Sequence, residues 1–109
     1  GVRLVGSEMC IRDSRYYIPL NTMVTVGRSK ESNIVINMGV IGRKHLEVFY
    51  DTDSRLFFLM DNHSVNHTYI NNKLCEPEVI YPVKPGSYLR LAGNSCVFQL
   101  GVVNEEYRG

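Results

Sequence analysis

The sequence lacks any long run of apolar residues, and this absence excludes a helix that spans a membrane. The longest uninterrupted apolar run is Leu56–Met60, whereas a membrane-spanning helix needs about 18 such residues. The chain also lacks the low hydrophobicity or the large net charge of a disordered chain. Of its 109 residues 44% are hydrophobic, and its formal net charge is +1. We therefore expect a folded chain of about one domain.

Neither sign of charge is in excess, since 12 Lys and Arg residues stand against 11 Asp and Glu residues. A balance of this kind provides no general attraction to nucleic acid or to an anionic membrane. We expect neither as a partner. A function that depends on charge must therefore come from a local cluster of residues.

Cysteine is scarce, and Cys10, Cys75 and Cys96 form no CxxC pair. An odd number of widely spaced cysteines argues against a disulfide scaffold and against a zinc knuckle. It favours a reducing, cytoplasmic location, although a bridge between Cys75 and Cys96 stays open.

His63 and His67 lie four residues apart, but in a predicted loop and not on a helix, so we expect neither a metal site nor a cofactor.

The first fourteen residues differ in character from the rest of the chain. They contain charges but no apolar core of a secretory signal peptide, and the stretch Gly6–Ser14 resembles translated adapter sequence. We expect residues 1–14 to be a non-native leader or a disordered arm; the alternative is a short native arm that wraps the domain. Residues 15–100 should form the globular domain, and the polar residues 101–109 should form a C-terminal tail that frays.

From residue 15 onward, short extended segments alternate with turn signals, and no window of ten residues carries a helical stripe. Apolar and polar residues alternate in His45–Tyr50 and in Tyr88–Leu91, as in strands with one buried face. Asn71-Asn72 suits a tight hairpin, and Pro85-Gly86 suits a type II turn. Many short strands at this spacing predict an all-β sandwich or barrel. The expected strands are 16–19, 23–26, 33–36, 45–50, 55–60, 68–70, 78–81, 88–91 and 96–100.

Two loops between the expected strands concentrate basic residues. Arg28 and Lys30 lie in the first loop, Arg43 and Lys44 lie in the second, and only Glu31 opposes them locally. Loops at one end of a sandwich converge, so these side chains can form one basic pocket. Phosphate suits such a pocket, because Arg offers a planar fork of donors and Lys offers a point charge. The alternative is a solvated rim of charge that has no ligand.

Five segments, taken in order, carry the most specific pattern in the sequence. They are Thr25-Val26-Gly27-Arg28, Asn33–Ile36, Gly42-Arg43-Lys44-His45, Asp61–Asn71 and Pro85–Leu91. In this order and spacing they resemble a forkhead-associated (FHA) domain that covers about residues 15–100. The resemblance implies an antiparallel β-sandwich of about eleven strands. It also implies a module that binds phosphothreonine peptides through loops at one end of the sandwich, without catalysis and without a cofactor.

The resemblance also implies roles for residues of the loops. Arg28 matches the arginine that holds the phosphate, and Asn66 matches the asparagine whose amide fixes the main chain of the ligand. His45 matches a histidine that ties the binding loops together by hydrogen bonds. The residues implied to bind the phosphopeptide are Arg28, Gly42, Arg43, Lys44, Asn66 and His67, and those implied to structure the loops are Gly27, His45, Ser64 and Thr68.

Three positions depart from the family pattern. Gly42 stands where the family has a serine that bonds the phosphate, so only a backbone N–H of Gly42 or Arg43 could serve there. Val65 replaces a polar residue, and His67 replaces a glycine, which is costly if its φ is positive. Each lost hydrogen bond to a charged group is worth about 1.5–3 kcal/mol.

These departures leave a second interpretation open, an FHA-like domain that binds a protein surface or scaffold without phosphate. In the first interpretation, the partner is a phosphothreonine-containing protein or peptide in a signalling pathway. In both, we expect a non-enzymatic module that is part of a larger multidomain protein.

Overall fold

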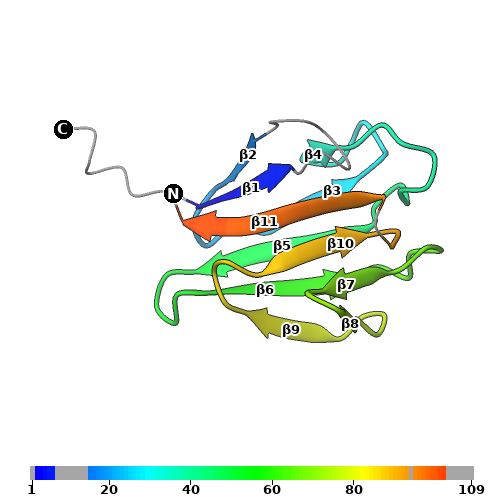
Figure 1. Cartoon of the computed structure of the whole chain (residues 1–109). Helices are drawn as coiled ribbons and strands as arrows, with labels where there is room; N and C mark the ends of the chain where they lie inside the picture. Colours follow the sequence, from blue (N-terminus) through cyan, green and yellow to red (C-terminus); the bar gives the residue numbers. More distant parts are fainter. Residues whose placement is uncertain (1, 7–14, 94, 103–109) are drawn as a thin grey trace.

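The computed structural model describes residues 2–6, 15–93 and 95–102, which form a sandwich of two β-sheets (Figure 1). One sheet has six strands in the order β2-β1-β11-β10-β7-β8, and the other has five in the order β4-β3-β5-β6-β9. The prediction of an all-β sandwich of about eleven strands is confirmed. No helix in this described part is long and apolar enough to cross a membrane. The strands are β1 (Val2–Gly6), β2 (Arg15–Ile18), β3 (Val24–Gly27), β4 (Ile34–Val35), β5 (Leu46–Asp51), β6 (Leu56–Asp61), β7 (Thr68–Ile70), β8 (Lys73–Leu74), β9 (Ile80–Val83), β10 (Tyr88–Leu91) and β11 (Cys96–Val102).

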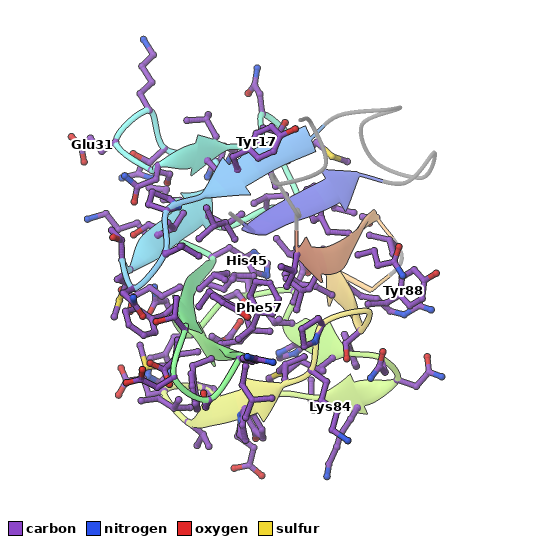
Figure 2. All side chains as sticks on the ribbon, turned by 90° about the vertical axis from the view of Figure 1, so that its left-hand side faces the viewer. Tyr17, Glu31, His45, Phe57, Lys84 and Tyr88 are labelled. Atoms are coloured by element: carbon purple, nitrogen blue, oxygen red, sulfur yellow. The ribbon has the colours of Figure 1, made fainter. Side chains whose placement is uncertain are left out.

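The core lies between the two sheets and is built from alternate residues of the strands. On β5, the side chains of Leu46, Val48 and Tyr50 are buried, and the residues between them are half-buried. Phe57 of β6 pairs with Tyr50 across the sheet, and the two rings meet edge to face with centroids 4.9 Å apart. Figure 2 shows Phe57 between the two layers. Alternate side chains of β10 and β11 complete this core from the other sheet.

The N-terminal segment differs from the expectation over Val2–Gly6. This strand, β1, pairs antiparallel with both β2 and β11, so it lies inside the six-stranded sheet. The physical reason is that Val2 and Val5 are good strand formers, and that β1 covers an edge of β11 that would otherwise be unpaired. The remainder of that expectation, residues 7–14, lies outside the described residues. At the other end β11 continues to Val102, beyond the expected boundary at residue 100, and residues 103–109 are also outside the described part.

Strand register brings three loops to one end of the sandwich. Leu46, the first residue of β5, pairs with Val26 near the end of β3 and with Asp61 at the end of β6. The loops 28–33, 36–45 and 62–67 therefore leave the five-stranded sheet at the same end, on the right of Figure 1. This arrangement places the basic residues of two loops close to the third.

Candidate functional site

An open hollow of about 940 Å³ lies at the loop end of the sandwich. Its cationic side chains are those of Arg28, Arg43 and Lys44, and the carboxylates of Glu31 and Glu47 also line it. Within the described part of the chain, none of these five groups forms an ion pair with another. Lys30, which the sequence groups with these cations, is exposed but is not part of the wall. The other residues of the wall are Ser29, Gly42, Asn62, His63, Ser64 and Val65.

Arg28 is held in place by two hydrogen bonds to the second loop. Its backbone N–H donates to the carbonyl of Gly42 at 2.9 Å, and its side-chain Nε donates to the carbonyl of Ile41 at 3.0 Å. The two terminal nitrogens of the guanidinium have no hydrogen-bond partner among the described residues, so they are available to a ligand. A guanidinium fixed in this way can present a planar fork to two oxygens of a phosphate group.

Gly27 allows the first and second loops to approach each other closely. A Cβ at this position would collide with the carbonyl oxygen of Arg43 and would lie 2.9 Å from the Cα of Lys44. The same Arg43 carbonyl accepts the backbone N–H of Ser29 and the hydroxyl of Ser32, each at 3.0 Å. Only glycine fits at position 27, because every other residue has a Cβ.

His45 ties the second loop to the third from inside the protein. Its side chain is fully buried, at 0% exposure, and Figure 2 shows it between the layers. Nδ1 accepts the backbone N–H of Gly42 at 3.0 Å, and Nε2 lies 2.9 Å from the carbonyl oxygen of His67. Because Nδ1 is the acceptor, the proton of the neutral ring is on Nε2, which donates to His67. Burial lowers the pKa of His45 below its ordinary value of 6.5, and the bond to His67 and the charge of Asp61 oppose this shift.

Asp61 anchors the third loop through a buried carboxylate. Its Oδ1 accepts the hydroxyls of Ser64 at 2.5 Å and of Thr68 at 2.6 Å, and its Oδ2 accepts the backbone N–H of Ser64 at 3.0 Å. A buried carboxylate is costly unless such donors satisfy it. Ser64 and Thr68, which the resemblance assigns to loop structure, thus both contact the same charged group.

Asn66 and His67 lie beside the hollow and are not part of its wall. The Nδ2 of Asn66 donates to the carbonyl of Val40 at 2.9 Å, which joins the third loop to the second. His67 is exposed, and its φ of 70° is in the left-handed region that favours glycine. Its carbonyl accepts both the ring of His45 and the backbone N–H of Ala92. Of the six expected ligand-binding residues, the hollow brings together Arg28, Gly42, Arg43 and Lys44.

The backbone N–H of Gly42 is used inside the protein and is not free for a ligand. It donates to Nδ1 of His45, so the expectation that this group could serve a ligand is wrong. The N–H of Arg43 has no hydrogen-bond partner among the described residues and stays available. The φ of Gly42 is outside the left-handed region, and a Cβ there would have Nδ1 of His45 as its nearest neighbour, at 3.6 Å. A residue with a side chain therefore fits at this position.

Glu47, Asn62 and His63 also line the hollow and were not predicted as site residues. Glu47 is half-buried and alternates with the buried residues Leu46 and Val48 of β5, so its place on the outer face follows from the strand pattern, but its place in the hollow does not. The exposed ring of His63 lies beside the carboxylate of Glu78, with 2.9 Å between Nε2 and Oε2, and the contact is an ion pair when the ring is protonated. Among the residues that the structure describes, no group of three or more His, Cys, Asp or Glu side chains could hold a metal ion.

Cys75 is a free thiol that is 4% exposed. The bridge between Cys75 and Cys96 that the sequence left open is therefore not formed. Burial, together with the nearby charge of Asp61, raises the pKa of Cys75 to about 11. The protonated thiol is a poor nucleophile and a poor metal ligand.

The sandwich and its loops define a binding module, in which side chains from converging loops surround a polar hollow. A family model described as the FHA domain matches residues 24–92, and the chain belongs to this family. FHA domains are binding modules and not enzymes.

Individual relatives resemble the chain over most of its length. FHA domain-containing protein PS1 of Arabidopsis thaliana is 27% identical over 78 residues, which are 72% of this chain but only 5% of that protein. The solution structure of the FHA domain of an Arabidopsis thaliana hypothetical protein is 24% identical, with a TM-score of 0.81, covering 94% of this chain and 86% of that one. The MEK1 FHA domain in complex with a HOP1 phosphothreonine peptide is also 24% identical, with a TM-score of 0.75, covering 94% of this chain and 97% of that one.

Proposed function

We propose that this chain binds phosphothreonine peptides and so recognises phosphorylated partner proteins. The observation that carries the proposal is the set of three cations, Arg28, Arg43 and Lys44, which two loops contribute to one hollow and which form no ion pair with a described residue. A phosphothreonine side chain has a charge of about −1.5 to −2 and three acceptor oxygens, which match such a set. The phosphothreonine peptide bound to the MEK1 FHA domain, a member of the same family, supports this choice of ligand.

The three cations of the hollow and the neighbouring Asn66 each have a role in this proposal. The fork of Arg28 binds two phosphate oxygens, and the backbone N–H of Arg43 binds the third. The side chains of Arg43 and Lys44 add positive charge near the phosphate or near an acidic flank of the peptide. The oxygen and the second N–H of the Asn66 amide bind the main chain of the ligand.

The module is proposed to act inside a longer protein. The segment of PS1 that matches this chain is a small part of a protein about twenty times longer than the match, since it covers 5% of its length. In such a protein, the module would bring the rest of the chain to a phosphorylated partner.

Titration of a phosphothreonine peptide library against Arg28→Ala tests the proposal, with fluorescence anisotropy as the measurement. We expect the variant to lose binding of the phosphorylated peptides and to lose little stability, because Arg28 is exposed and its side chain gives up one hydrogen bond, to Ile41. Arg55→Ala is the matched control, because Arg55 is an exposed arginine in the hairpin at the opposite end of the sandwich. Unchanged affinity in Arg28→Ala would contradict the proposal.

A second candidate function is docking to a protein surface without phosphate. The observation that favours it is Val65, whose apolar side chain is 84% exposed at the wall of the hollow. Equal affinity for phosphorylated and unphosphorylated forms of the same peptide would select this candidate.

A further inference from the structure

An apolar strip covers part of the outer face of the five-stranded sheet. It consists of Met23, Phe49, Phe58, Met60 and Ile80, which line a shallow depression. Met23 is 56% exposed and Ile80 is 63% exposed. An antiparallel sheet with a solvated face normally alternates apolar and polar residues, but β6 is apolar on both faces. An apolar patch of this kind indicates an interaction surface.

Glu47 connects the apolar strip to the basic hollow, because it is a lining residue of both. It pairs with Met60 of β6, and Met60 pairs with Ile80 of β9. These three residues form a row that runs across the sheet from β5 to β9, parallel to the loop end and next to it. Neighbouring strands are about 4.8 Å apart, so the row is about 10 Å long. An extended peptide covers this length with about three residues at roughly 3.3 Å each.

The carboxylate of Glu47 has the wrong sign for a phosphate ligand. It has no ion-pair partner among the described residues, and the three cations of the hollow already exceed the charge of the phosphate, which is about −1.5 to −2. Glu31, the other acid of the hollow, extends away from the sheets (Figure 2). Glu47 therefore favours a cationic side chain of the ligand at the point where the hollow meets the strip.

We propose that the phosphorylated partner continues from the hollow along the row of Glu47, Met60 and Ile80. A Lys or Arg of the partner pairs with Glu47, and a large apolar side chain about three residues further along packs on Met60 and Ile80. This specificity rests on the proposed function, because the phosphate fixes the register of the peptide. The partner class is thus a phosphoprotein with a basic and then an apolar residue on one side of its phosphothreonine.

An oriented peptide library with a fixed phosphothreonine and random flanks tests this inference. We expect the parent protein to select Lys or Arg at one flanking position and Ile, Leu, Met or Phe about three residues beyond it. Glu47→Lys should reverse the first preference to Asp or Glu. Ile80→Ser should remove the second preference and weaken the best peptide about five- to tenfold, with phosphate dependence retained.

Leu74→Ser is the matched control, because Leu74 is an exposed apolar residue of the other sheet; it should leave both preferences intact. Thermal unfolding of each variant verifies that the fold is retained.

The inference is overturned if Glu47→Lys and Ile80→Ser select the same flanks as the parent protein while phosphothreonine is still required. If no phosphorylated peptide binds and Arg28→Ala has no effect, both the proposed function and this inference fail. A parent protein that is dimeric by light scattering and becomes monomeric in Ile80→Ser would make the strip a contact between two copies, which also overturns the inference.

Discussion

The Nδ1 atom of His45 accepts the backbone hydrogen of Gly42 across 3.0 Å. This bond requires an unprotonated Nδ1, while Nε2 of the same ring donates to the carbonyl of His67. The neutral ring therefore satisfies one group from each of two loops, and a protonated ring would direct an N–H at the N–H of Gly42. The charge state of one buried side chain thus determines whether the second and third loops stay connected.

The protein should lose stability as the pH falls below about 6.5, the ordinary pKa of histidine. Burial lowers the pKa of His45 in the folded state, so the unfolded chain binds more protons between the folded pKa and the ordinary value. The free energy of unfolding therefore decreases as the pH falls through that window, and His45 adds no further loss below the folded pKa. Urea denaturation from pH 7.5 to pH 5 measures this profile.

Two variants assign this pH profile to His45. His45→Gln should flatten the profile, whereas His63→Gln, at an exposed histidine of the same hollow, should keep it. A steep acid loss that persists in His45→Gln would assign the titration to another group. His45→Ala should lower stability by about 2–4 kcal/mol and weaken peptide binding, because it removes both loop contacts and leaves a cavity.

Gly42→Ser should tighten binding of a phosphothreonine peptide about five- to tenfold, because it adds one hydroxyl donor at the hollow. The backbone conformation and the free space at Gly42 both allow the side chain. Isothermal titration with the phosphorylated peptide and its unphosphorylated twin measures the effect. Gly39→Ser is the matched control, since Gly39 lies in the same loop, outside the hollow, with open space around it. A Gly42→Ser variant with an unchanged ratio of the two affinities would show that the loop does not hold the phosphate.

His67→Gly should raise the free energy of unfolding by about 0.5–1 kcal/mol, because it relieves a left-handed backbone conformation. The carbonyl of residue 67, which accepts two hydrogen bonds, is retained in this variant. Val65→Gly is the contrasting substitution, since Val65 is exposed in the same loop and has no positive φ; it should lower stability through backbone entropy. Chemical denaturation of both variants provides the comparison, and a loss of stability in His67→Gly would contradict the strain argument.

Cys75 should react slowly with iodoacetamide at pH 7.5 as long as the protein is folded. The thiol is buried and its pKa is raised to about 11, so very little reactive thiolate is present. Peptide mapping by mass spectrometry follows this cysteine separately from the other two. The same reaction in guanidinium chloride should be fast and is the control. Equally fast labelling in the folded state would mean that the edge formed by β8 opens readily.

The long strands could be predicted from the alternation of apolar and polar residues. Strands that are extended only because they pair with a neighbouring strand could not. The segment 45–50 was expected as a strand and forms β5, because its alternating residues fit a face that one sheet buries. The strand β8 was missed, because Lys73 and Leu74 are extended only through pairing with Ile70 and Tyr69 across the turn at Asn71 and Asn72. β1 was missed for a related reason, since its structure depends on β2 and β11.

The cations of the candidate site could be predicted from the sequence. Which backbone N–H groups of the site are already used by other protein groups could not. Arg28, Arg43 and Lys44 follow or precede strands whose ends the fold brings together, so their positions could be inferred from the order of the segments. The use of the Gly42 N–H by His45 depends on distances that no sequence spacing contains. Glu47 was missed because its contact with both surfaces depends on which strands lie beside β5.

Strand β9 is the outer strand of its sheet, and it contributes Ile80 to the apolar strip. A free, apolar edge of this kind is a common starting point for aggregation, because another chain can add its own strand there. Pro82 lies in the middle of β9 opposite Phe58, and proline has no N–H to donate to an added strand. The protein can therefore present an apolar surface to a partner at high concentration without growing into fibres along this edge.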